Sequence, residues 1–262
     1  MIEAVLWRDR VIVGAGLALV ATSAWAWTLA GALMPMSHGA GTDAMTQAMS
    51  SMVMTPAPWS PAHATLVLCM WWVMMAAMMV PSAAPLILLV AAIHRRRHHD
   101  QPYAVVGLLT AGYLTVWGAF SVAATLMQWG LERTGLLSPE TMSVGTVVAG
   151  SILLAAGLYQ LTPLKQICLS RCRSPINFLT AHWRPGLAGP FRMGLVHGAY
   201  CFGCCWFLMT LLFVGGVMNP FWIGALAFYV LLEKLAPGGP WLSRVSGVIL
   251  SSAGVLALSR LL

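Results

Sequence analysis

The strongest constraint in this sequence is the near absence of charge along runs of apolar residues. Only 8% of its 262 residues are charged and 59% are hydrophobic, whereas an ordinary soluble domain carries about 25% charged residues. Such a chain cannot cover a surface that faces water, so its solvent must be lipid. The sequence therefore predicts an all-α membrane protein without a soluble domain.

Seven apolar segments follow one another along the chain, and each is interpreted as one membrane span. The first run is too long for the hydrophobic region of a signal peptide, so we expect it to be retained. The whole chain, 1–262, is thus predicted to form a single bundle of about seven transmembrane helices. The predicted spans are 11–33, 65–93, 104–128, 142–162, 192–217, 220–235 and 244–261.

The distribution of Lys and Arg predicts the orientation of these spans. If the N-terminus is cytoplasmic, twelve of the 14 basic residues, Lys165 and Lys234 among them, fall on the inner face. Only Arg133 and Arg260 fall outside, as the positive-inside rule requires. We expect a bacterial inner-membrane protein with a periplasmic C-terminus and a periplasmic Met-rich loop at 34–64. The net charge then indicates the lipid bilayer, and no nucleic acid, as partner.

One predicted span combines an imidazole with three thiols. His197 and Cys201 are four residues apart, and Cys204 and Cys205 follow Cys201 after three and four residues. Residues at these spacings share a helix face. Thiolate and imidazole favour Cu(I) or Zn(II) over hard cations, so the four residues form a candidate metal site. The alternative is packing, because free cysteine also behaves as a small hydrophobe.

The second predicted span carries two rows of methionines. Met70, Met74 and Met78 form one row at intervals of four residues, and Met75 and Met79 form the adjacent row. Thioethers are soft, neutral ligands that suit Cu(I) and can line an apolar helix without burying a charge. The alternative is that methionine here is an adaptable packing residue.

The predicted outer loop is also rich in soft ligands. It contains Met34, Met36 and His38, followed by four further methionines before position 55. Methionines in an exposed loop are explained if they capture a soft metal ion in an oxidising compartment. A short amphipathic helix across 43–54, resting on the bilayer, is the alternative.

The predicted inner loop, 163–190, contains a pair of cysteines four residues apart, Cys168 and Cys172. Arg171 and Arg173 lie beside them, and nearby positive charge favours the thiolate. A two-cysteine receiving site and an inert pair at the membrane surface are both consistent with this pattern. Glu233 is the one acid near the interior of a predicted span, and we expect it to pair with Lys165 or an arginine.

Several of these motifs together resemble a bacterial family described as predicted metal-binding integral membrane proteins. The specific parts are CFGCCWFLM at 201–209 and YQLTPLKQICLSRCRSP at 159–175, and the likeness covers roughly 65–250. The resemblance implies an inner-membrane helical protein that binds metal. It also implies that the cysteines of both segments and the methionines of the second span are motif positions.

The soft ligands are ordered by depth, with thioethers outside and thiols inside. This order predicts a protein that accepts Cu(I), with Zn(II) as the alternative metal, and either moves it inward or delivers it to a periplasmic, cytoplasmic or membrane copper carrier. We find no Ser/His/Asp arrangement, phosphate-binding glycine loop or carboxylate pair, so we do not expect an enzyme. A thiol-redox or assembly factor and a structural subunit without metal remain as alternatives.

Overall fold

The computed structural model describes residues 2–33, 59–98, 102–138, 141–184, 186 and 188–260. Within these ranges the chain is helical and has no strand beyond an isolated bridge between Leu137 and Val144, which confirms the all-α prediction. The helices are α1 (Ile2–Leu33), α3 (Pro61–His98), α4 (Tyr103–Arg133), α5 (Thr146–Gln160), α6 (Pro163–Arg173), α7 (Pro175–His182), α8 (Ala188–Thr210), α9 (Leu212–Gly215), α10 (Pro220–Leu235) and α11 (Gly239–Ser259).

The number of helices that can cross a membrane is lower than the sequence predicts. Within the described ranges, five helices are long and apolar enough, or six if α5 and α6, bent by 66°, form one broken span. The predicted span 220–235 is α10, which has 16 residues. At about 1.5 Å per residue its length is about 24 Å, short of a hydrocarbon layer of about 30 Å. Helix length therefore supports a multi-pass membrane protein but not the count of seven.

The segment predicted as an inner loop, 163–190, is largely helical. Pro163 begins α6 and Pro175 begins α7, positions where the missing proline N–H is tolerated. The Thr162 hydroxyl caps α6 by accepting a hydrogen bond from the Lys165 backbone N–H at 3.3 Å. Leu169 of α6 and Phe178 of α7 are buried. This segment is therefore part of the packed fold.

The second predicted span also begins earlier than expected. α3 starts at Pro61, and the Ser60 hydroxyl accepts a hydrogen bond from the His63 backbone N–H at 3.2 Å, as an N-cap does. The predicted outer loop therefore ends before 61. Residues 34–58 of this loop, which include Met34, Met36 and His38, lie outside the described residues.

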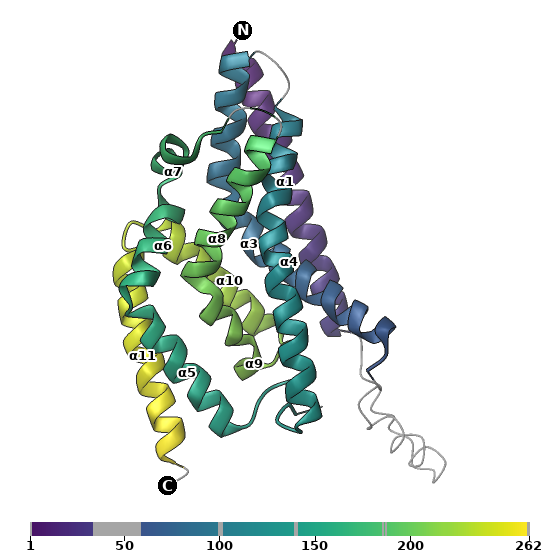
Figure 1. Ribbon diagram of the computed structural model, residues 1–262, viewed down its shortest axis with the longest axis vertical. Coiled ribbons are helices and arrows are strands. Elements are labelled where there is room, and N and C mark those ends of the chain that lie inside the picture. Colours follow the sequence, from purple (N-terminus) through teal and green to yellow (C-terminus); the bar gives the residue numbers. More distant parts are fainter. Residues whose placement is uncertain are drawn as a thin grey trace.

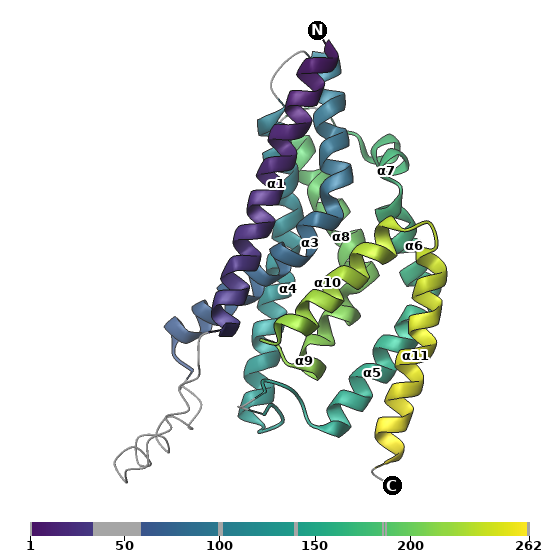
Figure 2. The same ribbon diagram turned by 180° about the vertical axis from the view of Figure 1, so that it is seen from behind.

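The helices form an elongated bundle in which α8 and α10 occupy the middle (Figures 1 and 2). In both views α1 lies on one side of them and the pair α5 and α11 lies on the other. The start of α1 and the end of α11 lie at opposite ends of the long axis. This arrangement places α8, which carries the three thiols, at the centre.

The pair α5 and α11 packs closely through glycines. A Cβ atom added at Gly254 would lie 2.6 Å from the Leu154 backbone nitrogen and 2.8 Å from the Gly150 carbonyl oxygen. Small residues that let backbones approach are a common basis of helix pairing in lipid, where the hydrophobic effect between helices is lost. Glycine is therefore required at this contact for steric reasons.

We predict that Gly254→Ala destabilises the protein by about 1–3 kcal/mol, because the new methyl group meets immobile backbone atoms. The matched control is Gly107→Ala in α4, where an added Cβ has no atom within 4 Å. That change should be neutral or stabilising by up to about 1 kcal/mol, as alanine favours helix. Unfolding in detergent measures both variants, and equal stabilities would contradict the proposed contact.

Candidate metal centre

The three thiols of α8 point into the protein. Cys201, Cys204 and Cys205 are 1%, 0% and 0% exposed. α8 approaches α4 closely because Gly194 and Gly198 have no side chain: an added Cβ at Gly198 would lie 2.9 Å from Val116 Cγ2. This close approach buries the three thiols. The thiols therefore face neighbouring helices and not lipid.

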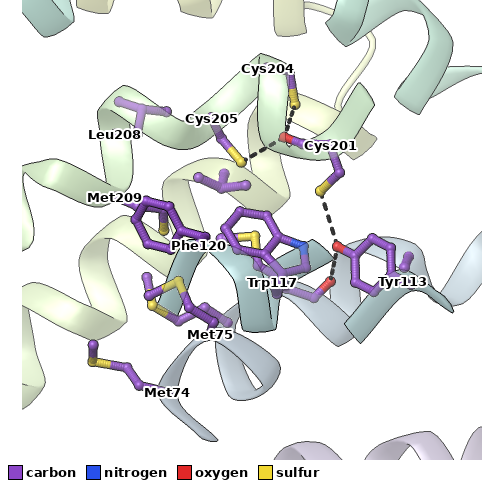
Figure 3. Close-up of a cluster of buried hydrophobic side chains, with 14 of the residues drawn as sticks. Met74, Met75, Tyr113, Trp117, Phe120, Cys201, Cys204, Cys205, Leu208 and Met209 are labelled. Atoms are coloured by element: carbon purple, nitrogen blue, oxygen red, sulfur yellow. Dashed lines mark hydrogen bonds between the residues drawn. The ribbon is translucent and has the colours of Figure 1, made fainter. Parts of the chain in front are cut away.

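The Cys201 sulfur lies where four helices meet. The Tyr113 hydroxyl of α4 lies 3.0 Å from this sulfur and donates a hydrogen bond to the Met79 carbonyl of α3 at 3.1 Å. Figure 3 shows the bond between the Tyr113 hydroxyl and the Cys201 thiol. The Lys234 ammonium of α10 donates to the same sulfur at 2.7 Å and to the Ser82 hydroxyl of α3 at 3.1 Å. One thiol thus connects α3, α4, α8 and α10.

The other two thiols of α8 have different surroundings. Both donate to the Cys201 carbonyl, Cys204 at 3.1 Å and Cys205 at 3.0 Å. The Cys204 sulfur also lies 3.9 Å from the Cys172 sulfur of α6. An added Cβ at Gly203 would lie 2.7 Å from the Cys168 sulfur. The cysteines predicted to form a separate receiving site therefore lie at the contact of α6 with α8.

The methionines of α3 belong to the same buried cluster as the thiols of α8. Met74, Met75, Met78 and Met79 are fully buried, while Met70 is partly buried against the cluster. Figure 3 shows Met74, Met75 and the cysteines of α8 in this cluster, together with Trp117 and Phe120. The structure thus places the methionines of α3 and the cysteines of α8 in one buried core. Both metal binding and plain packing are consistent with this arrangement.

His197 is buried one turn before Cys201. Its ring lies between those of Tyr113 and Phe178, at centroid distances of 5.8 Å and 5.1 Å. Its Nδ1 atom has no hydrogen-bond partner, whereas buried polar atoms normally have one. An unpartnered imidazole nitrogen on a side chain one helical turn from a buried thiol fits a soft metal by donor type. Within the described ranges, however, no three His, Cys, Asp or Glu side chains converge on one point.

Sequence reasoning missed the neighbours that the thiols acquire from other helices. Tyr113, Ser82 and Lys234 come from three different helices and were not predicted as site residues. Met209, a buried thioether eight residues after Cys201 on α8, was also missed. The one signal in the sequence that could have indicated these neighbours was Lys234, because it is a lysine in an otherwise apolar segment. The distribution of basic residues assigned it to the inner face instead.

A buried ion pair holds α10 beside this centre. The Lys165 ammonium and the Glu233 carboxylate are 2.8 Å apart, and both side chains are 0% exposed. This confirms the predicted pairing of Glu233, but it places Lys165 inside the protein. The Arg173 guanidinium also donates to the Glu233 carbonyl at 2.7 Å. These contacts position Lys234, the next residue along α10.

The part of the chain that contains this centre is similar to a known protein family. Residues 68–257 match the model of a family described as PpoB2, copper chaperone. No curated protein matches the chain, and no solved structure does. The matched range includes α8, α6, α10 and nearly all of α3, and therefore every residue of the candidate centre described above.

We predict that Glu233→Gln or Lys165→Met alone lowers the free energy of unfolding by about 3–5 kcal/mol, because each leaves a buried charge unpaired. The double variant Lys165→Met/Glu233→Gln removes both charges and should recover most of this loss. Denaturant unfolding of purified protein in detergent measures the cycle. Additive losses in the double variant would show that the two side chains do not stabilise each other.

Proposed function

This chain belongs to the PpoB2 family of copper chaperones, and we propose that it holds Cu(I) inside the bilayer and delivers it to another carrier. The proposed ligands are the thiol of Cys201 and one further thiol of α8, that of Cys204 or Cys205, together with the thioethers of α3, with His197 as a further donor. Thiolate and thioether are the side chains that prefer Cu(I). We propose this role in place of an enzymatic one.

The observation that carries the proposal is the position of the Cys201 sulfur. A polarizable sulfur atom lies at the junction of four helices, fully buried, in contact with a hydroxyl and an ammonium. Polar and ionisable groups in a lipid-embedded core are costly and mark functional sites. A core built only for packing would be expected to place an apolar side chain at this junction.

We propose a path for the ion that uses the other sulfur groups in turn. The methionines between 34 and 54, with His38, would capture Cu(I) from the periplasm of a bacterial inner membrane. The methionine rows of α3 would pass the ion to the α8 thiols, because thiolates bind Cu(I) more strongly than thioethers. Cys168 and Cys172, which lie at the contact of α6 with α8, would then receive it, and a soluble carrier would accept it inside.

We predict that protein purified with Cu(I) binds the metal and that Cys201→Ser/Cys204→Ser/Cys205→Ser loses most of it, since the hydroxyl is a poor ligand for a soft ion. The matched control is Cys69→Ser, which changes an exposed cysteine of α3 and should keep the wild-type stoichiometry. Elemental analysis of each purified protein gives the copper content. Unchanged copper in the triple variant would exclude the α8 site.

A second candidate function, thiol–disulfide exchange, is favoured by one specific distance. The sulfurs of Cys172 and Cys204 are 3.9 Å apart on different helices, whereas the adjacent Cys204 and Cys205 are badly placed to bridge each other. In such an exchange the two thiols form one disulfide and lose two electrons and two protons. The disulfide of a small thiol such as glutathione takes them up and becomes two thiols.

If this second function holds, glutathione disulfide should convert Cys172 and Cys204 to a form that resists alkylation until a reductant is added. Mass-tagging with a maleimide after denaturation, followed by electrophoresis, counts the free thiols, because Cys204 is fully buried in the folded protein. Cys172→Ser should leave Cys204 alkylatable under oxidising conditions, and Cys69→Ser should change nothing but the total count. If both thiols stay alkylatable in the oxidised wild type, the exchange function is excluded.

A further inference from the structure

We propose that Lys234 sets which charge of metal ion the α8 thiols accept, favouring a monovalent soft cation over a divalent one. The inference rests on the proposed function, because it concerns the same thiols. It adds a residue on another helix that does not bind the ion itself. Lys234 is therefore a specificity-determining residue, and its contribution is a fixed positive charge beside the site.

The Lys234 ammonium lies next to the α8 thiols, and no carboxylate among its described contacts compensates its charge. The side chain is 4% exposed, and its ammonium contacts the Cys201 sulfur at 2.7 Å and the Ser82 hydroxyl at 3.1 Å. In the described part of the chain the ion pairs are Asp9 with Arg95 and Lys165 with Glu233. The carboxylate next to Lys234 is thus engaged elsewhere, and sulfur is the group that can balance the ammonium.

The total charge of the loaded site then depends on the ion. Cu(I) bound by two thiolates has a charge of minus one, and the Lys234 ammonium brings the total to zero. Zn(II) bound by the same two thiolates is neutral, so the ammonium is left without compensation. An uncompensated charge in a buried site is strongly unfavourable. A site of this kind therefore discriminates by ion charge in addition to ligand softness.

A third anionic ligand could restore neutrality for a divalent ion, but the arrangement of the thiols does not provide one. The Cys204 sulfur lies toward Cys172 of α6, at 3.9 Å, while Cys201 is directed at Tyr113 and Lys234. Across the described ranges no three His, Cys, Asp or Glu side chains converge on one point. The neutral thioethers of α3 add softness without adding charge.

The test compares affinities for Ag(I), a monovalent soft ion without redox chemistry, and Zn(II) in purified full-length protein. Lys234→Met removes the charge, and Lys234→Gln removes it while keeping a donor for Ser82. Lys234→Arg keeps the charge. The matched control, Arg244→Met, removes one positive charge from an exposed position on α11. Competition with chelators of known affinity gives the ratio of the Ag(I) and Zn(II) dissociation constants.

We expect both neutral variants to lower the preference for Ag(I) over Zn(II) by about tenfold or more, since a like charge nearby penalises the divalent ion most. Lys234→Arg and Arg244→Met should stay within about threefold of the wild type. Neutral variants that keep the wild-type ratio would overturn the inference and leave the proposed function standing. A wild type that binds Zn(II) as tightly as Ag(I) would overturn it regardless of the variants. A wild type that binds neither Ag(I) nor Cu(I) would instead exclude the proposed function.

Discussion

Two lysine ammonium groups lie inside the helical bundle, and the packing around the centre depends on how they are compensated. Lys165 is paired with Glu233, and Lys234, the next residue of α10, contacts the Cys201 sulfur. Because an unpaired buried charge costs several kcal/mol, these partners cannot drift apart without loss of stability. The two contacts therefore fix α10 against α6 and α8 at adjacent positions, and α10 in turn brings Lys234 to the thiols.

This constraint separates three cysteines that the sequence places in one group. Cys201 faces a phenol and an ammonium, Cys204 faces a second thiol on α6, and Cys205 contacts only its own helix among the hydrogen bonds described. The three sulfurs are buried alike but differ in chemistry. The proposed metal-holding role rests on the first environment, and the alternative of thiol exchange rests on the second.

The burial of the methionines of α3 is consistent both with packing and with binding of a soft metal. Four of the five predicted thioether ligands are fully buried in a core cluster that also contains aromatic residues, as a packing residue would be. A neutral ligand that conducts a soft ion through lipid must occupy the same kind of position, because it carries no charge to expose. Burial therefore does not distinguish the two roles. The proposed metal role rests instead on the polar junction at Cys201, for which packing alone gives no reason.

The sequence by itself determined the all-helical class and the presence of several helices apolar enough to span a membrane. These follow from composition and from spacings within one helix, which local geometry sets. It also indicated that Glu233 pairs with Lys165 or an arginine, and the structure shows Lys165 as the partner. Only the tertiary structure decided which other helix each helix face contacts. It places the Cys172 sulfur near the Cys204 sulfur and the Lys234 ammonium against the Cys201 sulfur. The spacing of residues within a helix defines which side chains share a face, but it does not say which other helix that face contacts. The rule that places Lys and Arg in loops likewise cannot predict a buried lysine, because the carboxylate or sulfur that compensates its charge comes from another helix.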